Sequence, residues 1–282
     1  MNAISVVIIT YNEEANIGRC LDSVMLLADE IIVLDAYSTD KTVEIAKGRG
    51  ALVKQGYFLG HIQQKNAAVS LASHDYILSL DADEAPDKTL VESILQVKSN
   101  LTAAAYSMNR CTNYCGKYIR NGTWYPDKKV RLFNKHIARW GGINPHDRIE
   151  LTGTDRRIQH LKGDILHYSF PSIDKHLEKN NKYSSIAAQA LYARGKKSSW
   201  FKIILNPFWA FVHCYFVRLG FLDGFYGFVI AINTAHGTFL KYIKLYYLQR
   251  VKNTKKTSGQ PVRAGTITVA EQVNTVANDI AP

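Results

Sequence analysis

One segment constrains the fold of this chain more than any other. Residues 76–84 run an apolar stretch, Tyr76 to Leu80, directly into Asp81, Asp83 and Glu84. Such a run is typical of a strand buried on both faces of a parallel sheet. The strand would deliver its last residues to the carboxyl edge of the sheet, where open α/β sheets bind their ligands. Two acids one residue apart at that edge can hold a divalent cation, although the pattern alone also suits a solvated acidic turn.

The segments before residue 76 alternate between strand and helix patterns. Strands are expected at 4–9, 31–34 and 51–54. One helix is expected after the loop at 10–14, a second after the polar turn at 38–40 and a third at 63–72. This alternation predicts an α/β fold with a mostly parallel, doubly wound sheet. Polar residues then fall at strand ends, where a nucleotide would lie.

The chain has 282 residues, and its charge is unevenly distributed. Residues 1–150 carry 17 Lys and Arg against 17 Asp and Glu, whereas residues 151–282 carry 18 against 7. The four cysteines form no CxxC pair and no zinc-ligand spacing, so we expect a reduced, cytoplasmic setting. No basic segment followed by a long apolar one opens the chain, so no secretory signal is expected.

The second half combines helical patterns with aromatic and basic residues. Residues 174–192 predict an amphipathic helix, and residues 200–248 are apolar but interrupted by polar and charged side chains. A transmembrane helix needs about 20 mainly apolar residues without such breaks. We therefore expect two helices that lie in the surface of an anionic membrane, with a helical cap or a self-association surface as the alternative. The cations expected to attract anionic lipid are Arg194, Lys196, Lys197, Lys202, Lys241, Lys244 and Arg250.

Four motifs in order carry a specific resemblance. They are the run at 5–14, the run at 29–35 with the turn at 38–42, Gln64-Lys65-Asn66, and Asp81-Ala82-Asp83. Together they resemble the family 2 glycosyltransferases, whose fold is called GT-A, over roughly residues 4–150. The later segments 124–127, 131–133, 145–147 and 220–224 resemble bacterial enzymes that add glucose to the inner core of lipopolysaccharide.

The resemblance implies an inverting transferase that moves glucose from UDP-glucose to a heptose of a lipopolysaccharide or lipooligosaccharide core. A polyprenyl phosphate or another cell-envelope glycan is the alternative acceptor. The acceptor would be lipid-anchored, so the enzyme is expected on the inner face of the cytoplasmic membrane. The expected divisions are a GT-A core at 1–150, an acceptor-side helical region at 151–250 and a flexible tail at 251–282.

The resemblance also assigns the donor site. In the family, the loop after the first strand and the acid after the second clasp the nucleoside, and other polar groups meet ribose or diphosphate. Asp35 could instead cap a turn, Lys65 could be a solvated helix lysine, and Arg131 could be exposed at a strand edge. Asp40 is expected to cap its own helix. The donor-binding residues so implied are Thr10, Asn12, Glu13, Asp35, Lys65, Asp81 and Arg131.

The resemblance makes Asp83 the expected ligand of Mg²⁺ or Mn²⁺, with His146 as a second ligand or an orienting group. Displacement at the anomeric carbon also needs a base for the acceptor hydroxyl. Asp147 is preferred because it follows a Gly- and Pro-containing segment that suits a loop lining a site, and because related enzymes carry a His-acid pair there. Asp127, among aromatic and basic residues, is the alternative base. His167 has only a weak functional assignment.

A different class of function is a basic nucleic-acid-binding protein, which the cationic second half suggests. The sequence lacks the RNA-recognition, helix-turn-helix and zinc patterns of such proteins, so no nucleic-acid partner is expected. A sugar-nucleotide pyrophosphorylase is disfavoured because no Gly-rich loop with Arg or Lys follows the first strand. A non-catalytic sugar-nucleotide binder is disfavoured because both acids and a candidate base are present.

Overall fold

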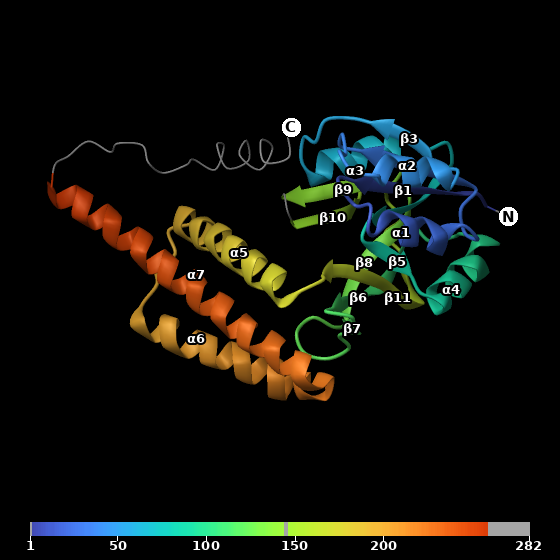
Figure 1. Cartoon of the computed structure of the whole chain (residues 1–282). Helices are drawn as coiled ribbons and strands as arrows, with labels where there is room; N and C mark the ends of the chain where they lie inside the picture. Colours follow the sequence, from blue (N-terminus) through green and yellow to red (C-terminus); the bar gives the residue numbers. More distant parts are fainter. Residues whose placement is uncertain (1, 144–145, 259–282) are drawn as a thin grey trace. The chain divides into compact units, whose positions relative to one another are not determined.

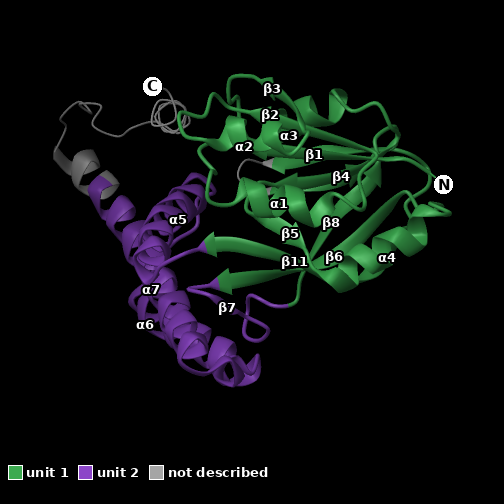
Figure 2. Cartoon of the chain, turned by 45° about the vertical axis from the view of Figure 1, so that its right-hand side comes forward, with its two compact units in different colours: residues 1–113, 126–169 green, residues 114–125, 170–282 purple. Residues whose placement is uncertain are grey.

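The computed structural model describes residues 2–143 and 146–258, and the chain divides into two compact units (Figure 2). Unit 1 contains Met1–Asn113 and Pro126–Ser169, and unit 2 contains Tyr114–Tyr125 and the chain from Phe170 onward. This division differs from the boundary expected at residue 150. Residues 158–169 stay with unit 1 because they form a strand of its sheet, and residues 114–125 pack with the helices of unit 2.

The large sheet has nine strands, in the order β3-β2-β1-β4-β8-β6-β11-β5 with β7 beside β6, and all of them except β7 lie mainly in unit 1. Figure 1 labels β1, β3, β8, β6 and β11 among these strands. Strands β3, β2, β1 and β4 are parallel, whereas β8 is antiparallel to β4 and β6, and β5 is antiparallel to β11. The strands are β1 (Ile4–Thr10), β2 (Glu30–Asp35), β3 (Leu52–Gln55), β4 (Tyr76–Asp81), β5 (Glu84–Pro86), β6 (Ala105–Tyr114), β7 (Lys117–Tyr118), β8 (Asp127–Asn134) and β11 (Ile158–Phe170). Two further strands, β9 (Ala138–Ile143) and β10 (His146–Leu151), form a separate antiparallel pair.

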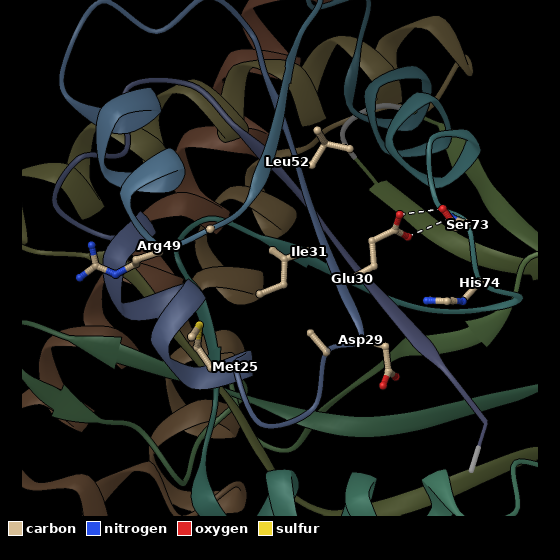
Figure 3. Close-up of a pocket in the computed structure, with 10 residues that line it drawn as sticks. Met25, Asp29, Glu30, Ile31, Arg49, Leu52, Ser73 and His74 are labelled. Carbon is tan, nitrogen blue, oxygen red and sulfur yellow. Dashed lines mark hydrogen bonds between the residues drawn. The ribbon is translucent and has the colours of Figure 1, made fainter.

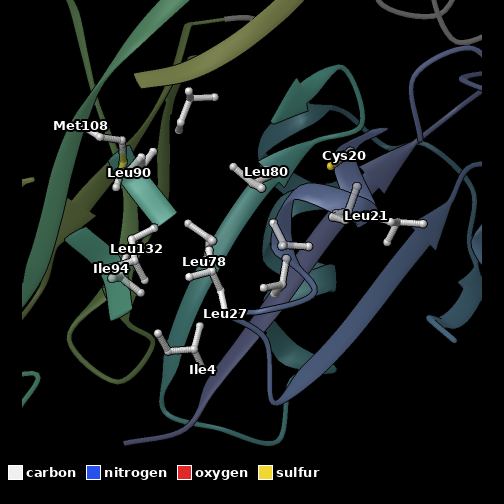
Figure 4. Close-up of a cluster of buried hydrophobic side chains, with 14 of the residues drawn as sticks. Ile4, Cys20, Leu21, Leu27, Leu78, Leu80, Leu90, Ile94, Met108 and Leu132 are labelled. Atoms are coloured by element: carbon white, nitrogen blue, oxygen red, sulfur yellow. The ribbon is translucent and has the colours of Figure 1, made fainter. Parts of the chain in front are cut away.

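Both faces of the parallel strands are buried. Val6 and Ile8 of β1 belong to one hydrophobic cluster and Val7 to the other, because successive side chains of a strand point to opposite faces. The first cluster also contains Leu21 of α1 and Ile94 of α4 (Figure 4). The apolar runs therefore form central strands, as expected. The helices of this unit are α1 (Ile17–Val24), α2 (Thr42–Gly48), α3 (His61–Ser70) and α4 (Lys88–Lys98).

Unit 2 contains three long helices, α5 (Ile173–Ala193), α6 (Trp200–Val212) and α7 (Gly224–Ser258). Helices α5 and α6 each begin after a serine, Ser172 or Ser199, whose side chain accepts a backbone N–H of the first turn. Helix α7 packs against both of the others. A π-helical turn at 213–217 and a 3₁₀ turn at 220–223 connect α6 to α7.

Membrane-spanning potential in the described residues is limited to this connected pair. No single helix there has the length and apolarity to cross a bilayer. The segments Trp200–Val217 and Gly220–Val251 meet that test only when taken together, and they bend by 70° at the break between them.

The loop at 114–125 is fastened to the helices of unit 2. The Tyr114 hydroxyl lies 3.0 Å from Nδ1 of His176 on α5. Trp124 stacks on Phe170 with ring centroids 5.0 Å apart. The carboxylate of Asp223, just before α7, accepts the Asn121 backbone N–H at 2.8 Å. Aromatic packing and a buried carboxylate therefore tie this loop to α5 and to the turn before α7.

Candidate active site

The described strands β1, β2, β3 and β4 all end at one edge of the sheet. Residue pairing aligns Thr10 with Asp35, Asp35 with Gln55, and Ile9 with Asp81. The polar residues that close β1, β2 and β4 therefore share the edge where ligands bind in open α/β sheets. The strand-end placement expected for Thr10, Asp35 and Asp81 is confirmed.

Lys65 of α3 joins two acids at this edge. Its Nζ lies 2.9 Å from Oδ1 of Asp81 and 2.7 Å from Oδ2 of Asp147 on β10. The Lys65 side chain is only 4% exposed, and its ammonium lies 4.3 Å from the centroid of the Trp140 ring. A buried cation needs paired charges, and these two carboxylates supply them. The alternative of a solvated helix lysine is wrong.

A second buried cation, Arg131 of β8, lies on the other side of Asp81. Its guanidinium lies 3.3 Å from Oδ2 of Asp81 and binds both oxygens of Glu84, at 2.7 and 3.1 Å. Glu84 is fully buried and also accepts the Asp81 backbone N–H at 3.2 Å. Arg131 is 4% exposed, so the alternative of an exposed strand-edge arginine is wrong.

These contacts set the charge state of Asp81. Burial on its own would raise the pKa of Asp81, but the charges of Lys65 and Arg131 outweigh burial and hold that pKa well below its usual range. In the same way, burial opposes the charge of Arg131 while Glu84 and Asp81 raise its pKa above its ordinary value. Asp81 and Arg131 are therefore both charged at neutral pH.

Asp83 meets His167, to which the sequence gave only a weak functional assignment. Its Oδ2 lies 3.2 Å from Nε2 of His167 on β11, and its carbonyl accepts the Tyr168 backbone N–H at 2.9 Å. His167 is opposite Glu84 in the register of β11 and β5. The residues around His167 gave no indication of its partner. The signal that makes it a site residue is this long-range pairing, which a single sequence does not contain.

Asp83 and His167 fit a divalent cation that also binds phosphate. Magnesium and manganese accept carboxylate and water oxygens, and such sites use one or two protein carboxylates together with substrate phosphates. Imidazole nitrogen suits several divalent metals, and Nε2 is the ring nitrogen of His167 that lies beside Asp83. Within residues 2–143 and 146–258, no group of three or more potential ligands surrounds such a position, so phosphate and water would complete the coordination.

His146, the other expected metal ligand, opens β10 and pairs with Ile143 in the register of the hairpin. Its side chain lies outside the described part of the structure. The assignment of His146 therefore stays a prediction.

The two candidate bases occupy different surroundings. Asp147 is 14% exposed and contacts Lys65, so it belongs to the cluster around Asp81. Asp127, at the start of β8, lies between Arg110 at 2.8 Å and Lys129 at 3.0 Å. Asp127 and Arg131 are four positions apart, which is roughly 13 Å along a strand. Arg110 also lies 3.6 Å from Glu84, so Asp127 is linked through Arg110 to the same ionic network as Asp147. Only Asp147 contacts Lys65, which pairs with Asp81.

Asp35 and Thr10, two of the residues expected to contact the nucleoside, differ in their hydrogen bonding. Asp35 is fully buried, and it accepts the Ser38 backbone N–H at 2.9 Å and the Gln55 side-chain amide at 3.0 Å. These bonds are the turn-capping role that was the alternative for Asp35. The hydroxyl of Thr10, its neighbour in register, is buried and has no hydrogen-bond partner among the residues that the structure describes. A buried hydroxyl left open in this way is available to a ligand.

The loop after β1 is attached to the turn before α2. Asn12 adopts φ +51°, and its side-chain oxygen accepts the Thr39 backbone N–H at 2.8 Å. The Glu13 backbone N–H donates to the Thr42 hydroxyl at 2.8 Å, and its carboxylate accepts from Asn16 at 2.7 Å. These side chains shape the loop, and their contact with a nucleoside stays a prediction.

Asp40 supports the same turn. Its carboxylate accepts the Thr42 backbone N–H at 3.0 Å and the Glu14 backbone N–H at 3.1 Å. Thr42 is the first residue of α2, but Lys41 occupies the N-cap position and its side chain makes no capping hydrogen bond, so the helix-capping role expected for Asp40 is wrong. Asp40 instead holds the backbone of the turn before the helix.

A hollow elsewhere in unit 1 does not belong to this site. Figure 3 shows it lined by Asp29, Glu30, Ser73 and His74, which lie at or just before the amino-terminal ends of β2 and β4. Its acids are occupied, because Glu30 binds the Ser73 hydroxyl at 2.8 Å and Asp29 pairs with Lys98 at 2.6 Å. Because its lining residues lie at the amino-terminal ends of the strands, the hollow is at the edge opposite Asp81.

The sheet and its carboxyl edge define an α/β enzyme of the GT-A type. Residues 5–153 match the family model of glycosyl transferase family 2. An uncharacterized glycosyltransferase of Rickettsia prowazekii is 37% identical over 257 residues, which cover 87% of either chain. The chain belongs to glycosyltransferase family 2, and the fold and family implied by the sequence motifs are confirmed.

Two more distant similarities are also present. LpsC of Rhizobium meliloti, a lipopolysaccharide core biosynthesis glycosyltransferase, is 28% identical over 271 residues, which cover 88% of this chain and 94% of LpsC. Glucosyl-3-phosphoglycerate synthase of Mycobacterium tuberculosis, solved with Mn²⁺, uridine diphosphate and glucosyl-3-phosphoglycerate, overlaps 40% of this chain and 44% of its own. That overlap has 26% identity and a TM-score of 0.34.

Proposed function

We propose that the protein transfers glucose from UDP-glucose, with inversion, to a heptose of a lipopolysaccharide or lipooligosaccharide core. The observation that carries the proposal is the clustering of Asp81, Lys65, Arg131 and Asp147 at the carboxyl edge, beside the pair of Asp83 and the β11 histidine. The similarity to LpsC supports a core acceptor. A polyprenyl phosphate or another cell-envelope glycan is the alternative acceptor.

The donor is held by a hydroxyl, a carboxylate and a metal-binding pair along the edge. Thr10 offers an open hydroxyl near the nucleoside, and Asp81 offers an ionised carboxylate to the ribose hydroxyls. Asp83 and His167 would hold Mg²⁺ or Mn²⁺ against the diphosphate. When bound, the cation would stabilise the negative charge that develops on the departing nucleoside diphosphate.

Asp147 takes the proton of the acceptor hydroxyl. Lys65 holds this carboxylate at 2.7 Å and at the same time contacts Asp81, so one side chain positions the base relative to the donor-binding acid. A base that contacts the acceptor contributes to transfer without contributing to donor binding. The family more often has Glu at this position, and the side chain of Asp147 is shorter. The acceptor hydroxyl must therefore approach close to the contact between Asp147 and Lys65.

The test is a transfer assay with a panel of sugar nucleotides and of lipopolysaccharides truncated at successive core positions. Mass spectrometry of the products should detect one added hexose on a heptose-terminated core, with UDP-glucose as the donor. Transfer to polyprenyl phosphate alone would replace the acceptor with the alternative. If no donor in the panel is transferred or hydrolysed while the protein binds RNA in a salt-sensitive manner, the nucleic-acid-binding alternative holds and the proposal is wrong.

A further inference from the structure

The outward face of α6 is apolar along its whole length. Six of its large side chains are between 55% and 77% exposed, while Ile203 is buried. Their spacing, two adjacent positions repeated every four residues, places them on one side of the helix. They are Trp200, Phe201, Ile204, Leu205, Phe208 and Trp209.

The apolar surface continues beyond α6 into the turn and the start of α7. Large exposed apolar side chains recur there, and between Lys202 and Lys241 the sequence has only two charged residues, Arg218 and Asp223. Asp223 is 4% exposed, and Asn121 donates to its carboxylate, so this acid is withdrawn from the surface. Monomeric soluble proteins rarely expose apolar patches of this extent. The residues that continue the patch are Phe216, Val217, Leu219, Phe221, Leu222, Phe225, Phe228 and Ile232.

Cations accompany the apolar surface, and acids are almost absent. From residue 179 to residue 258, Asp223 is the only carboxylate in the sequence. Lys196, Lys197 and Lys202 lie at the start of α6 and are exposed, while Arg218 follows its C-terminal end and is also exposed. The charge of this surface is therefore complementary to an anionic one.

We infer that α6 and the turn after it insert, in the plane of the surface, into an anionic lipid bilayer. Trp and Phe on the α6 face enter the boundary between headgroups and acyl chains, and the cations at both ends of the helix meet lipid phosphates. This inference concerns an interaction surface and does not depend on the identity of the sugar donor or the acceptor.

The geometry favours insertion in the plane over a span. Helix α6 has 13 residues, so at about 1.5 Å per residue it is roughly 20 Å long, shorter than the ~30 Å core of a bilayer. The pair is also folded back on itself, because Ser198 donates to the Tyr242 carbonyl at 2.9 Å and Gln249 donates to the Lys196 carbonyl at 2.9 Å. A single span across both helices would break these bonds.

The inserted apolar face changes the expected response to salt. The cations alone predict attachment that high salt releases, because exposed charges are screened. Burial of the α6 face is not screened in this way. We therefore expect salt to weaken the initial binding, while protein that is already inserted stays bound at 1 M salt, a concentration chosen for a Debye length of about 3 Å.

The experiment uses the full chain and sucrose-loaded vesicles of phosphatidylcholine with or without phosphatidylglycerol. The wild type should co-sediment with the anionic vesicles and remain bound after a high-salt wash. Phe201→Ser, Leu205→Ser and Phe208→Ser, combined, should weaken binding at least about tenfold, because these exposed side chains carry the insertion. The matched control combines Leu26→Ser, Leu71→Ser and Leu95→Ser, which change exposed leucines of unit 1, and it should bind as the wild type does.

The depth of the α6 tryptophans in the bilayer distinguishes insertion in the plane from deeper insertion. Lipids brominated near the headgroup should quench the tryptophan fluorescence more than lipids brominated near the chain ends, and Trp200→Phe with Trp209→Phe should remove the effect. Stronger quenching by the deep bromines would overturn insertion in the plane. Equal binding by the α6 variant and the control would overturn the inference as a whole. It would equally be overturned if the wild type ignores vesicles and forms a dimer that the α6 variant abolishes, since the face would then bind a second copy of the chain.

Discussion

Asp147 and Lys65 form the contact on which the assignment of the base depends. Their 2.7 Å contact joins β10 to α3 and places a carboxylate beside the acid that closes β4. Asp127 lacks such a position, because Arg110 and Lys129 occupy its oxygens at the other end of β8. At the scale of single residues, the structure therefore separates two acids that the sequence left as alternatives.

Replacing Asp147 by Asn should lower the rate of transfer at least about a hundredfold, because a positioned general base contributes factors of that size. Binding of UDP should change little, since the base contacts the acceptor. The measurement is the transfer rate together with calorimetric binding of UDP.

Asp127→Asn is the comparison for this prediction, and it should cause a smaller loss. It also removes one of the two carboxylates that pair with Arg110, so thermal unfolding of each variant is needed to separate folding from chemistry. An inactive Asp127 variant beside an active Asp147 variant would reverse the assignment.

The residues of the edge differ in how far the sequence could predict them. Asp81 and Asp83 are local, because they end an apolar run, and Lys65 and Arg131 came from the motifs of the family. The pairing of Asp83 with His167 depends on β11 lying beside β5, and Glu84 acquires its role only when Arg131 reaches it across the sheet. No local pattern contains such contacts.

Helix α5 contacts the loop at 114–125 through a buried histidine, His176. Burial, and next the charge of Lys179, lower the pKa of His176 from 6.5 to about 4. The ring is neutral in the folded protein and accepts a hydrogen bond from, or donates one to, Tyr114. Protonation of this ring therefore opposes the folded state of unit 2.

The pH dependence of stability follows from that shift. The stabilisation is fully present above pH 6.5, the pKa that the unfolded chain would have, and it is lost progressively as the pH falls to about 4. One pKa unit corresponds to about 1.4 kcal/mol, so the loss amounts to at most about 3.5 kcal/mol. Urea unfolding at a series of pH values should show this decline in the free energy of unfolding.

His176→Gln should flatten the decline, because glutamine keeps a polar partner for Tyr114 and does not titrate. His236→Gln, which changes an exposed histidine of α7, is the matched control and should retain the wild-type dependence. Equal pH dependence in both variants would mean that His176 is not the titrating group.

The break between α6 and α7 shows where element prediction fails. The sequence predicted two helices in this region, but polar and charged side chains interrupt the apolar pattern at several points, so the position of the break was not predicted. The chain turns because Leu219 adopts φ +57° and because Asp223 is held by the backbone of Asn121, about a hundred positions earlier. Helical periodicity is a local property, so it does not contain this restraint.

At the scale of the whole molecule, the two units differ in charge more sharply than the two halves of the sequence do. Unit 1 carries 18 Lys and Arg against 19 Asp and Glu, whereas unit 2 carries 17 against 5. The cations of the loop at 114–125 belong to the helical unit, and the acids of residues 151–169 belong to the sheet. A nearly neutral catalytic unit is thus attached to a strongly basic one, a combination that suits an enzyme acting on acceptors anchored in anionic lipid.

We expect the carboxyl edge of unit 1 to bind a nucleoside diphosphate together with a divalent cation, which calorimetric titration with UDP can measure. The wild type should bind UDP at least about tenfold more tightly with Mn²⁺ than in chelator, and Asp83→Asn should lose that increase because it removes the carboxylate that pairs with His167. Lys128→Gln, which changes an exposed lysine of β8, should retain it. Metal-independent binding, or an Asp83 variant that keeps the full increase, would contradict the account.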